Sequence, residues 1–241
     1  MPATLFFPAA ALHAALVLPW SVLAMSGAVR GPVALSSPFG HAHEMLLGYA
    51  LAVVAGYQVP RMSPVRLWLL FAGWVLARVA FIALPHTLLA ALVNAGFAIA
   101  VALHVAPRLL RAAKKLRNQA LPALLVAVCA AAAAYAVAAP AAEALTLHAL
   151  VTALVLLLAG LMLFMGGRIL APAVAGEFYR QRRSLAARVQ PRVEGALIAI
   201  IAVAALAAAL RIDALTRTAC ALAGVLAAVR LARWRLWRCV H

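Results

Sequence analysis

Long apolar runs, each separated from the next by a short polar or basic stretch, make up most of the chain. A helix needs about 20 consecutive apolar residues to cross the hydrocarbon core of a bilayer. Runs of this kind predict eight spans, at residues 4–26, 41–60, 66–84, 87–106, 120–139, 145–165, 194–210 and 213–230. Because such long apolar runs cross lipid as helices, the pattern predicts an all-α, polytopic bundle of transmembrane helices in one membrane domain.

Composition supports this prediction and excludes an ordinary soluble fold. Of the 241 residues, 68% are hydrophobic and 11% are charged, whereas a soluble domain is about half apolar and about a quarter charged. A soluble chain of this length has no interior large enough for so much apolar surface. The lipid bilayer is therefore the expected surroundings of most side chains.

Basic residues are concentrated in a few of the segments that connect the predicted spans. If the N-terminus is cytoplasmic, the cytoplasmic segments hold 17 of the 21 Lys and Arg residues; these segments are 60–66, 107–119, 166–193 and the tail after 229. Cytoplasmic loops of membrane proteins carry such an excess of basic residues. We therefore expect both termini in the cytoplasm and attribute the net charge of +16 to topology, not to a nucleic-acid partner.

Ionisable residues within the spans are candidates for function, because a charge in the bilayer is costly unless it has a partner. His41, His43 and Glu44 lie together at the outer end of the second span, and Arg78 lies inside the third. Four more histidines fall in or beside the spans: His13 in the first, His86 after the third, His104 near the cytoplasmic end of the fourth and His148 in the sixth. Histidine is the commonest metal and haem ligand. Each of these histidines could instead be a hydrogen-bonded packing residue.

Helix geometry separates the two histidines of the second span. Two residues advance an α-helix by about 200°, so His41 and His43 point in nearly opposite directions. We expect them to have separate roles, although a non-helical entry to the span would let both reach one metal ion together with Glu44. In a regular helix, His41 shares a face with Met45, Gly48 and Ala52. For Arg78, three interpretations are open: contact with the outer headgroups, pairing with Glu44, or pairing with an anionic cofactor group.

The run HAHEMLLGYALAVVAGY, residues 41–57, resembles the second-span signature of the NnrS family. Three further pieces resemble the family in the same order: residues 74–78, which end in Arg78; Gly166-Gly167-Arg168, as a turn after the sixth span; and the basic tail from Arg230. The family comprises bacterial membrane proteins linked to nitric oxide and nitrosative stress and reported to carry haem and copper. The resemblance thus implies an inner-membrane protein with haem, copper or both.

The resemblance also implies roles for individual residues. His41 or His43 would be an axial haem ligand, with His13, His86 or His148 as its partner, and Arg78 would neutralise a propionate. Copper would be held by His41, His43 and Glu44. The family often has a histidine late in the fifth span, where this chain has alanines followed by Tyr135. Either that ligand is lost or Tyr135 stands in its place.

Three functions compete at this point. The first is a haem or copper protein that handles or senses nitric oxide, with enzymatic turnover left open. The second is a membrane transporter without a prosthetic group, in which histidines and Glu44 bind a cation in transit. The third is an assembly subunit: the family usually has more spans than the eight predicted here, so a partner subunit or a second copy would supply the rest. No soluble nucleophile–base arrangement, phosphate-binding loop or pair of catalytic carboxylates is evident in the sequence.

Overall fold

Helices make up the chain wherever it is described by the computed structural model, which covers residues 1–112, 116–185 and 190–235. No strand occurs in these ranges. The basic segments 107–119 and 166–193 and the basic tail lie partly outside them. In chain order the elements are α1 (Pro2–Met25), the 3₁₀ turn η1 (Val33–Leu35), α2 (Pro38–His43), the π-helix η2 (Glu44–Ala50), α3 (Leu51–Gln58), α4 (Pro64–Ala83), α5 (Leu88–Ala112), α6 (Leu116–Ala138), α7 (Ala144–Arg180), α8 (Pro191–Ala209) and α9 (Asp213–Trp234).

The helices confirm the all-α transmembrane bundle. Among the described residues, seven single helices are long and apolar enough to cross a membrane. They coincide with seven of the eight predicted spans. The remaining span, predicted at 41–60, is helical over residues 38–58 but consists of three consecutive pieces, α2, η2 and α3. Its middle piece is a π-helix, which the apolar pattern does not reveal.

Helix α7 is much longer than the predicted span 145–165. It continues to Arg180 and has 37 residues, or about 55 Å at about 1.5 Å per residue, whereas the hydrocarbon core is about 30 Å thick. Gly166-Gly167-Arg168 therefore lies inside a helix, and the prediction of a turn there was wrong. A glycine costs a helix only about 1 kcal/mol relative to alanine, and Gly167 is packed against a side chain of α9.

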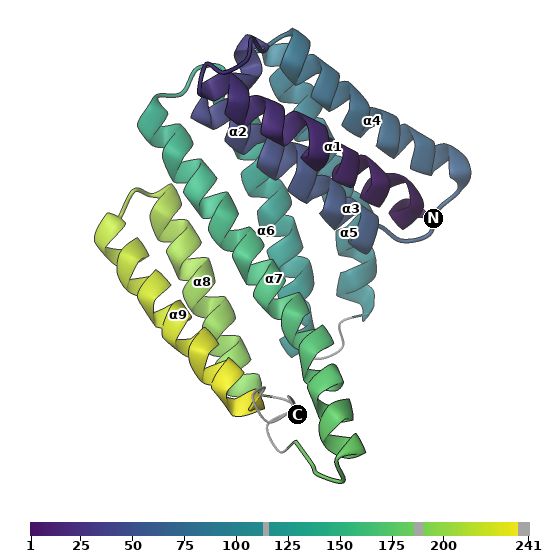
Figure 1. Ribbon diagram of the computed structural model, residues 1–241, viewed down its shortest axis with the longest axis vertical. Coiled ribbons are helices and arrows are strands. Elements are labelled where there is room, and N and C mark those ends of the chain that lie inside the picture. Colours follow the sequence, from purple (N-terminus) through teal and green to yellow (C-terminus); the bar gives the residue numbers. More distant parts are fainter. Residues whose placement is uncertain (113–115, 186–189, 236–241) are drawn as a thin grey trace.

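Consecutive helices pack side by side from α4 to α9, and α1 lies along α3 and η2. Figure 1 shows α1, α3 and α4 inclined to the group formed by α5, α6 and α7, while α8 and α9 form a hairpin at the edge of the bundle. In this arrangement η2 contacts both α1 and α4. This crossing places the polar residues of the second span inside the protein.

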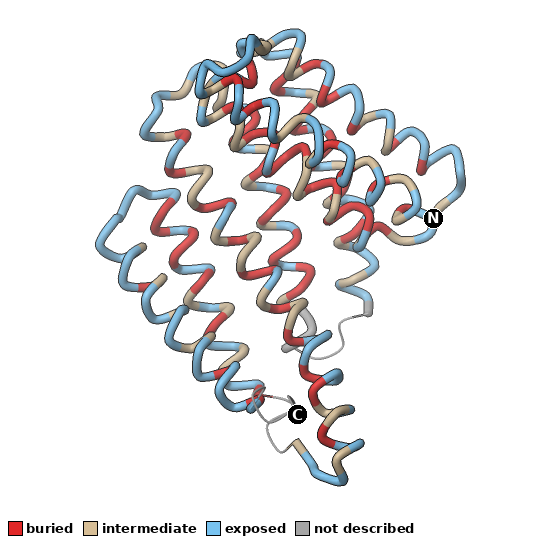
Figure 2. The backbone as a smooth tube through the Cα atoms, viewed as in Figure 1, coloured by how far each residue is buried: buried red, intermediate tan, exposed pale blue. Residues whose placement is uncertain are grey.

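Burial follows this arrangement. In Figure 2 the buried positions gather where the central helices meet, and α9 is mostly exposed. Large apolar side chains such as Leu69, Leu103 and Met162 are more than half exposed. In a bundle of this kind such side chains face lipid. The protein is therefore a multi-pass membrane protein in a lipid bilayer.

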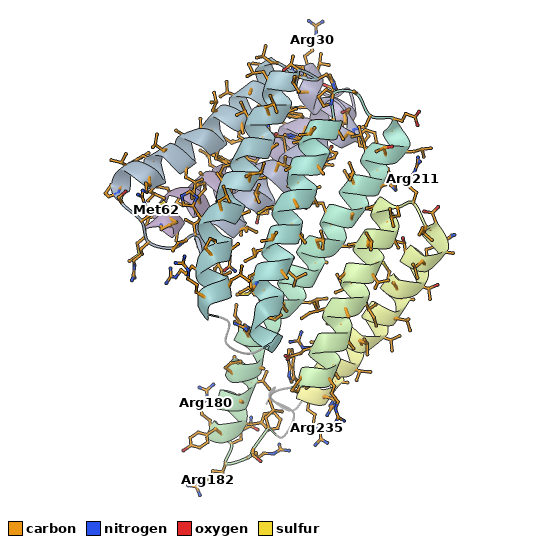
Figure 3. All side chains as sticks on the ribbon, turned by 180° about the vertical axis from the view of Figure 1, so that it is seen from behind. Arg30, Met62, Arg180, Arg182, Arg211 and Arg235 are labelled. Atoms are coloured by element: carbon orange, nitrogen blue, oxygen red, sulfur yellow. The ribbon has the colours of Figure 1, made fainter. Side chains whose placement is uncertain are left out.

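The connections separate to two ends of the bundle. Figure 3 shows Arg30 and Arg211 toward one end and Arg180, Arg182 and Arg235 at the other. Connecting segments that alternate between the two sides of a membrane must be separated in this way. That the second of these ends is cytoplasmic stays a prediction from the basic residues.

Candidate functional site

Glu44, the first residue of η2, is the centre of a buried polar network. Its side chain is fully buried. Arg78 of α4 donates a hydrogen bond from Nη1 to Glu44 Oε1 over 2.6 Å, and Arg78 Nη2 donates to Asn94 Oδ1 of α5. The amide of Asn94 in turn donates to the carbonyl oxygens of Ala77 (3.1 Å) and Ala90 (2.9 Å). A carboxylate, a guanidinium and an amide thus join three helices in the membrane interior, where an unpaired charge is costly.

Two histidines contact the same carboxylate from different sides. His43 Nδ1 lies 3.0 Å from Glu44 Oε1, and His13 Nε2 of α1 lies 3.1 Å from Oε2. Both histidines are buried. Gly48 makes the approach of His13 possible, because a Cβ at this position would lie 2.5 Å from His13 Nε2 and 3.0 Å from Glu44 Oε2. The glycine of the second-span motif therefore provides room for an imidazole.

The π-helix accounts for which residues of the second span face inward. In a π-helix each N–H bonds to the carbonyl five residues back, and such turns occur frequently at functional sites. The Trp74 indole donates a hydrogen bond to the Gly48 carbonyl oxygen over 2.9 Å, so this irregular backbone is tied to α4. The expectation that Met45 shares a face with Gly48 and Ala52 was wrong: Met45 is 39% exposed, whereas the other two are buried. The wider turn shifts their register.

A cavity of about 400 Å³ lies beside this network. Its polar lining includes His43, His86, Asn94 and Tyr135, and much of the rest comes from the segment between Val33 and Gly40 and from alanines of α5 and α6. The His43 ring stacks on Phe81 with centroids 3.6 Å apart and planes at 7°. Tyr135 donates a hydrogen bond from its hydroxyl to the Phe39 carbonyl oxygen over 2.8 Å. Tyr135, considered above as a substitute for a histidine, thus faces the same cavity as His43.

His86 stands at the exposed side of this cavity. Its backbone is left-handed, with φ of 62°, a conformation in which histidine is among the more frequent non-glycine residues. His86 lies in the turn between α4 and α5.

The remaining predicted site residues lie elsewhere. His41 is half-buried, and its Nδ1 lies 2.6 Å from Ser21 Oγ of α1. His148 is exposed on α7 and is not part of the cavity lining. His41 and His43 therefore have different neighbours, as helix geometry predicts. Within the described part of the chain, no three His, Cys, Asp or Glu side chains are placed to hold a metal ion, and the set His41, His43 and Glu44 does not converge.

Asn94 and Phe81 are site residues that the sequence analysis missed. Asn94 had a usable signal, since it is an amide in the middle of an apolar span and such residues usually face the bundle interior. Phe81 had none, because a phenylalanine in an apolar run is equally suited to lipid or to a site. Only the packing of α4 against the second span shows that Phe81 faces the site and not lipid.

A family model with the description "NnrS protein" matches residues 4–241, nearly the whole chain. No curated protein and no solved structure matches the chain.

Proposed function

The chain belongs to the NnrS family, and on this premise we propose that it is a haem protein of the bacterial inner membrane that handles or senses nitric oxide. The family match supports the location and the biological role. The choice of haem and of its ligand is based on the site itself.

One observation carries the proposal: His43 contacts a carboxylate through Nδ1 while its ring lines the cavity. Glu44 is paired with Arg78, and an ionised carboxylate only accepts hydrogen bonds. His43 Nδ1 therefore carries the proton, and Nε2 keeps its lone pair. A histidine held by a carboxylate through one nitrogen and offering the other is the usual arrangement of a metal ligand with its supporting partner.

The donor set fits haem better than a copper ion held by the protein alone. Copper sites in proteins take several side-chain ligands, and no group of three suitable side chains converges in the described residues. Haem iron needs one or two axial ligands. The cavity volume of about 400 Å³ is in the range of small-molecule sites, about 300–1,000 Å³. Haem bound here would supply an iron centre able to take a diatomic ligand.

The chain's own residues then have defined roles. His43 would hold the haem iron, and His86 and Tyr135 are polar side chains of the cavity wall. Arg78 has two of its nitrogens engaged by Glu44 and Asn94, so we assign it to orienting Glu44 and not to a propionate. Copper, if bound, would need ligands beyond this cluster.

The test is an optical spectrum of the purified protein, oxidised and reduced, for the wild type and two histidine variants. His43→Ala should lose haem content by about tenfold or more, seen as loss of the Soret band. His41→Ala is the matched control, since it removes an imidazole two residues away that contacts Ser21, and it should keep the band.

Two results would contradict the proposal. One is a wild-type protein that shows no Soret band in either the oxidised or the reduced state. The other is a His43→Ala protein that elutes as a folded species and has an unchanged spectrum.

A further inference from the structure

A second buried arginine lies far along the chain from the Glu44 network. Arg230 of α9 is 5% exposed. It donates from Nη1 to the Leu163 carbonyl oxygen (2.8 Å) and from Nη2 to Glu194 Oε1 (3.0 Å). Its guanidinium stacks on Trp234, with Cζ 5.0 Å from the ring centroid. These contacts join α7, α8 and α9 near the end of the bundle marked by Arg235 in Figure 3.

Two N–H donors at this place have no acceptor among the described residues: Arg230 Nε and Trp234 Nε1. Trp234 is 2% exposed. A buried donor without an acceptor costs about 1–3 kcal/mol, and such groups in a native protein usually mark a water molecule, an ion or a ligand.

Both side chains line a groove of about 480 Å³ between α7 and α9. Apart from them the lining is apolar: Ala159, Met162, Leu163, Gly166, Gly167, Leu170, Ala227 and Leu231. On α7 the lining extends from residue 159 to residue 170, or about 16 Å along the helix axis. Arg230 thus meets the groove beside Leu163 and Gly167, and apolar walls run along the transmembrane helix α7 on either side of it.

We propose that this groove binds an anionic glycerophospholipid. One acyl chain lies along α7, and an ester carbonyl oxygen accepts hydrogen bonds from Trp234 Nε1 and Arg230 Nε. A neutral acceptor suits this position because Glu194 already balances the charge of Arg230. The phosphate lies beyond it, at the level of the exposed Arg233 and Arg235. Basic residues at the membrane boundary attract anionic headgroups.

The groove offers a way to block the acyl chain without touching the donors. A Cβ on Gly166 would meet no atom within 4 Å, so Gly166→Phe places a ring in the groove. Gly176→Phe is the matched control, because this glycine is on the same helix, is equally open and does not line the groove. Trp234→Phe removes one donor, and Trp68→Phe, on an exposed ring of α4, is its control.

The experiment counts dioleoyl phosphatidylglycerol bound to the full-length, detergent-purified chain by native mass spectrometry, with dioleoyl phosphatidylcholine, inorganic phosphate and decylubiquinone as alternative probes. We expect phosphatidylglycerol to bind the wild type and both controls equally. Gly166→Phe should weaken binding by more than about tenfold, and Trp234→Phe by about fivefold, the value of one hydrogen bond.

Equal binding in the wild type and Gly166→Phe would overturn the proposal, as would equal affinity for phosphatidylcholine, tighter binding of decylubiquinone, or binding of phosphate alone. The proposal is independent of the haem assignment, since none of these variants touches the Glu44 network, and the optical spectrum should be the same in all of them.

Discussion

Two regions of the molecule pair a buried arginine with a glutamate, and they differ in what surrounds the pair. Around Glu44 and Arg78, two imidazoles and an amide add further polar groups, the backbone is a π-helix, and a cavity opens beside His43. Around Glu194 and Arg230, the additional acceptor is a backbone carbonyl, and the neighbouring groove is mainly apolar. Both regions have a glycine whose missing side chain makes room, Gly48 in one and Gly167 in the other.

The comparison teaches that an arginine–glutamate pair does not by itself indicate what a region binds. A pair can join helices, and replacing such pairs by apolar residues is often neutral or stabilising in soluble proteins. What distinguishes the Glu44 region is an excess of titratable groups over the number needed to balance one charge. Two histidines on one carboxylate that already has an arginine are not needed for packing.

The largest expected effect comes from breaking the first pair. Glu44→Gln leaves Arg78 buried without a counter-charge, and removing one partner of a buried pair destabilises by about 3–5 kcal/mol. For a chain of this length, thermal unfolding shifts by about 2–4 °C per kcal/mol. The thermal unfolding midpoint of the variant in detergent, determined by size-exclusion chromatography after heating, measures this loss of stability.

Glu177→Gln is the control for this change, because Glu177 pairs with the exposed Arg180 one turn along α7. Exposed pairs contribute about 0–1 kcal/mol. Similar midpoints for the two variants would mean that the Glu44 network contributes nothing to stability.

A smaller effect is expected from adding a methyl group at either close glycine. A Cβ at Gly48 would lie 2.5 Å from His13 Nε2, and one at Gly167 would overlap Arg230 Nη2. Each alanine variant should lose about 1–3 kcal/mol through overpacking.

Open glycines of the same bundle provide controls for both. Gly96→Ala and Gly166→Ala introduce a Cβ with no atom within 4 Å, so they should be neutral or stabilising by up to about 1 kcal/mol through helix propensity. If Gly48→Ala or Gly167→Ala matched its control, the close approach at that glycine would not exist. A haem spectrum altered by Gly48→Ala and not by Gly167→Ala would sharpen the difference between the regions.

The smallest of these effects is expected at the π-helix. Trp74→Phe keeps an aromatic ring but removes the hydrogen bond to the Gly48 carbonyl oxygen, a loss of roughly 1 kcal/mol. Trp68→Phe is the control, since Trp68 is 57% exposed on the same helix. The thermal unfolding midpoints of both variants in detergent measure this loss. An equal shift in the two variants would show that the indole hydrogen bond does not support η2.

The sequence by itself determined the class of the protein and the position of its helices, because the length of an apolar run reports directly on contact with lipid. Every predicted span corresponds to helical residues, and the polar run from His41 to Glu44 was recognisable without coordinates. The family assignment also followed from that run. Asn94 was within reach of the same reasoning, as an amide in an apolar span.

Only the tertiary structure decided which of these groups meet. The contact of Arg78 with Glu44 joins residues 34 positions apart, and that of Arg230 with Glu194 joins residues 36 apart. Neither follows from local spacing, because the inclination and register of packed helices depend on all their side chains together. The π-helix is the clearest case: one wider turn moved Met45 outward and gave His13 and His43 access to the same carboxylate. This backbone irregularity is tied to another helix by the hydrogen bond from the Trp74 indole to the Gly48 carbonyl oxygen.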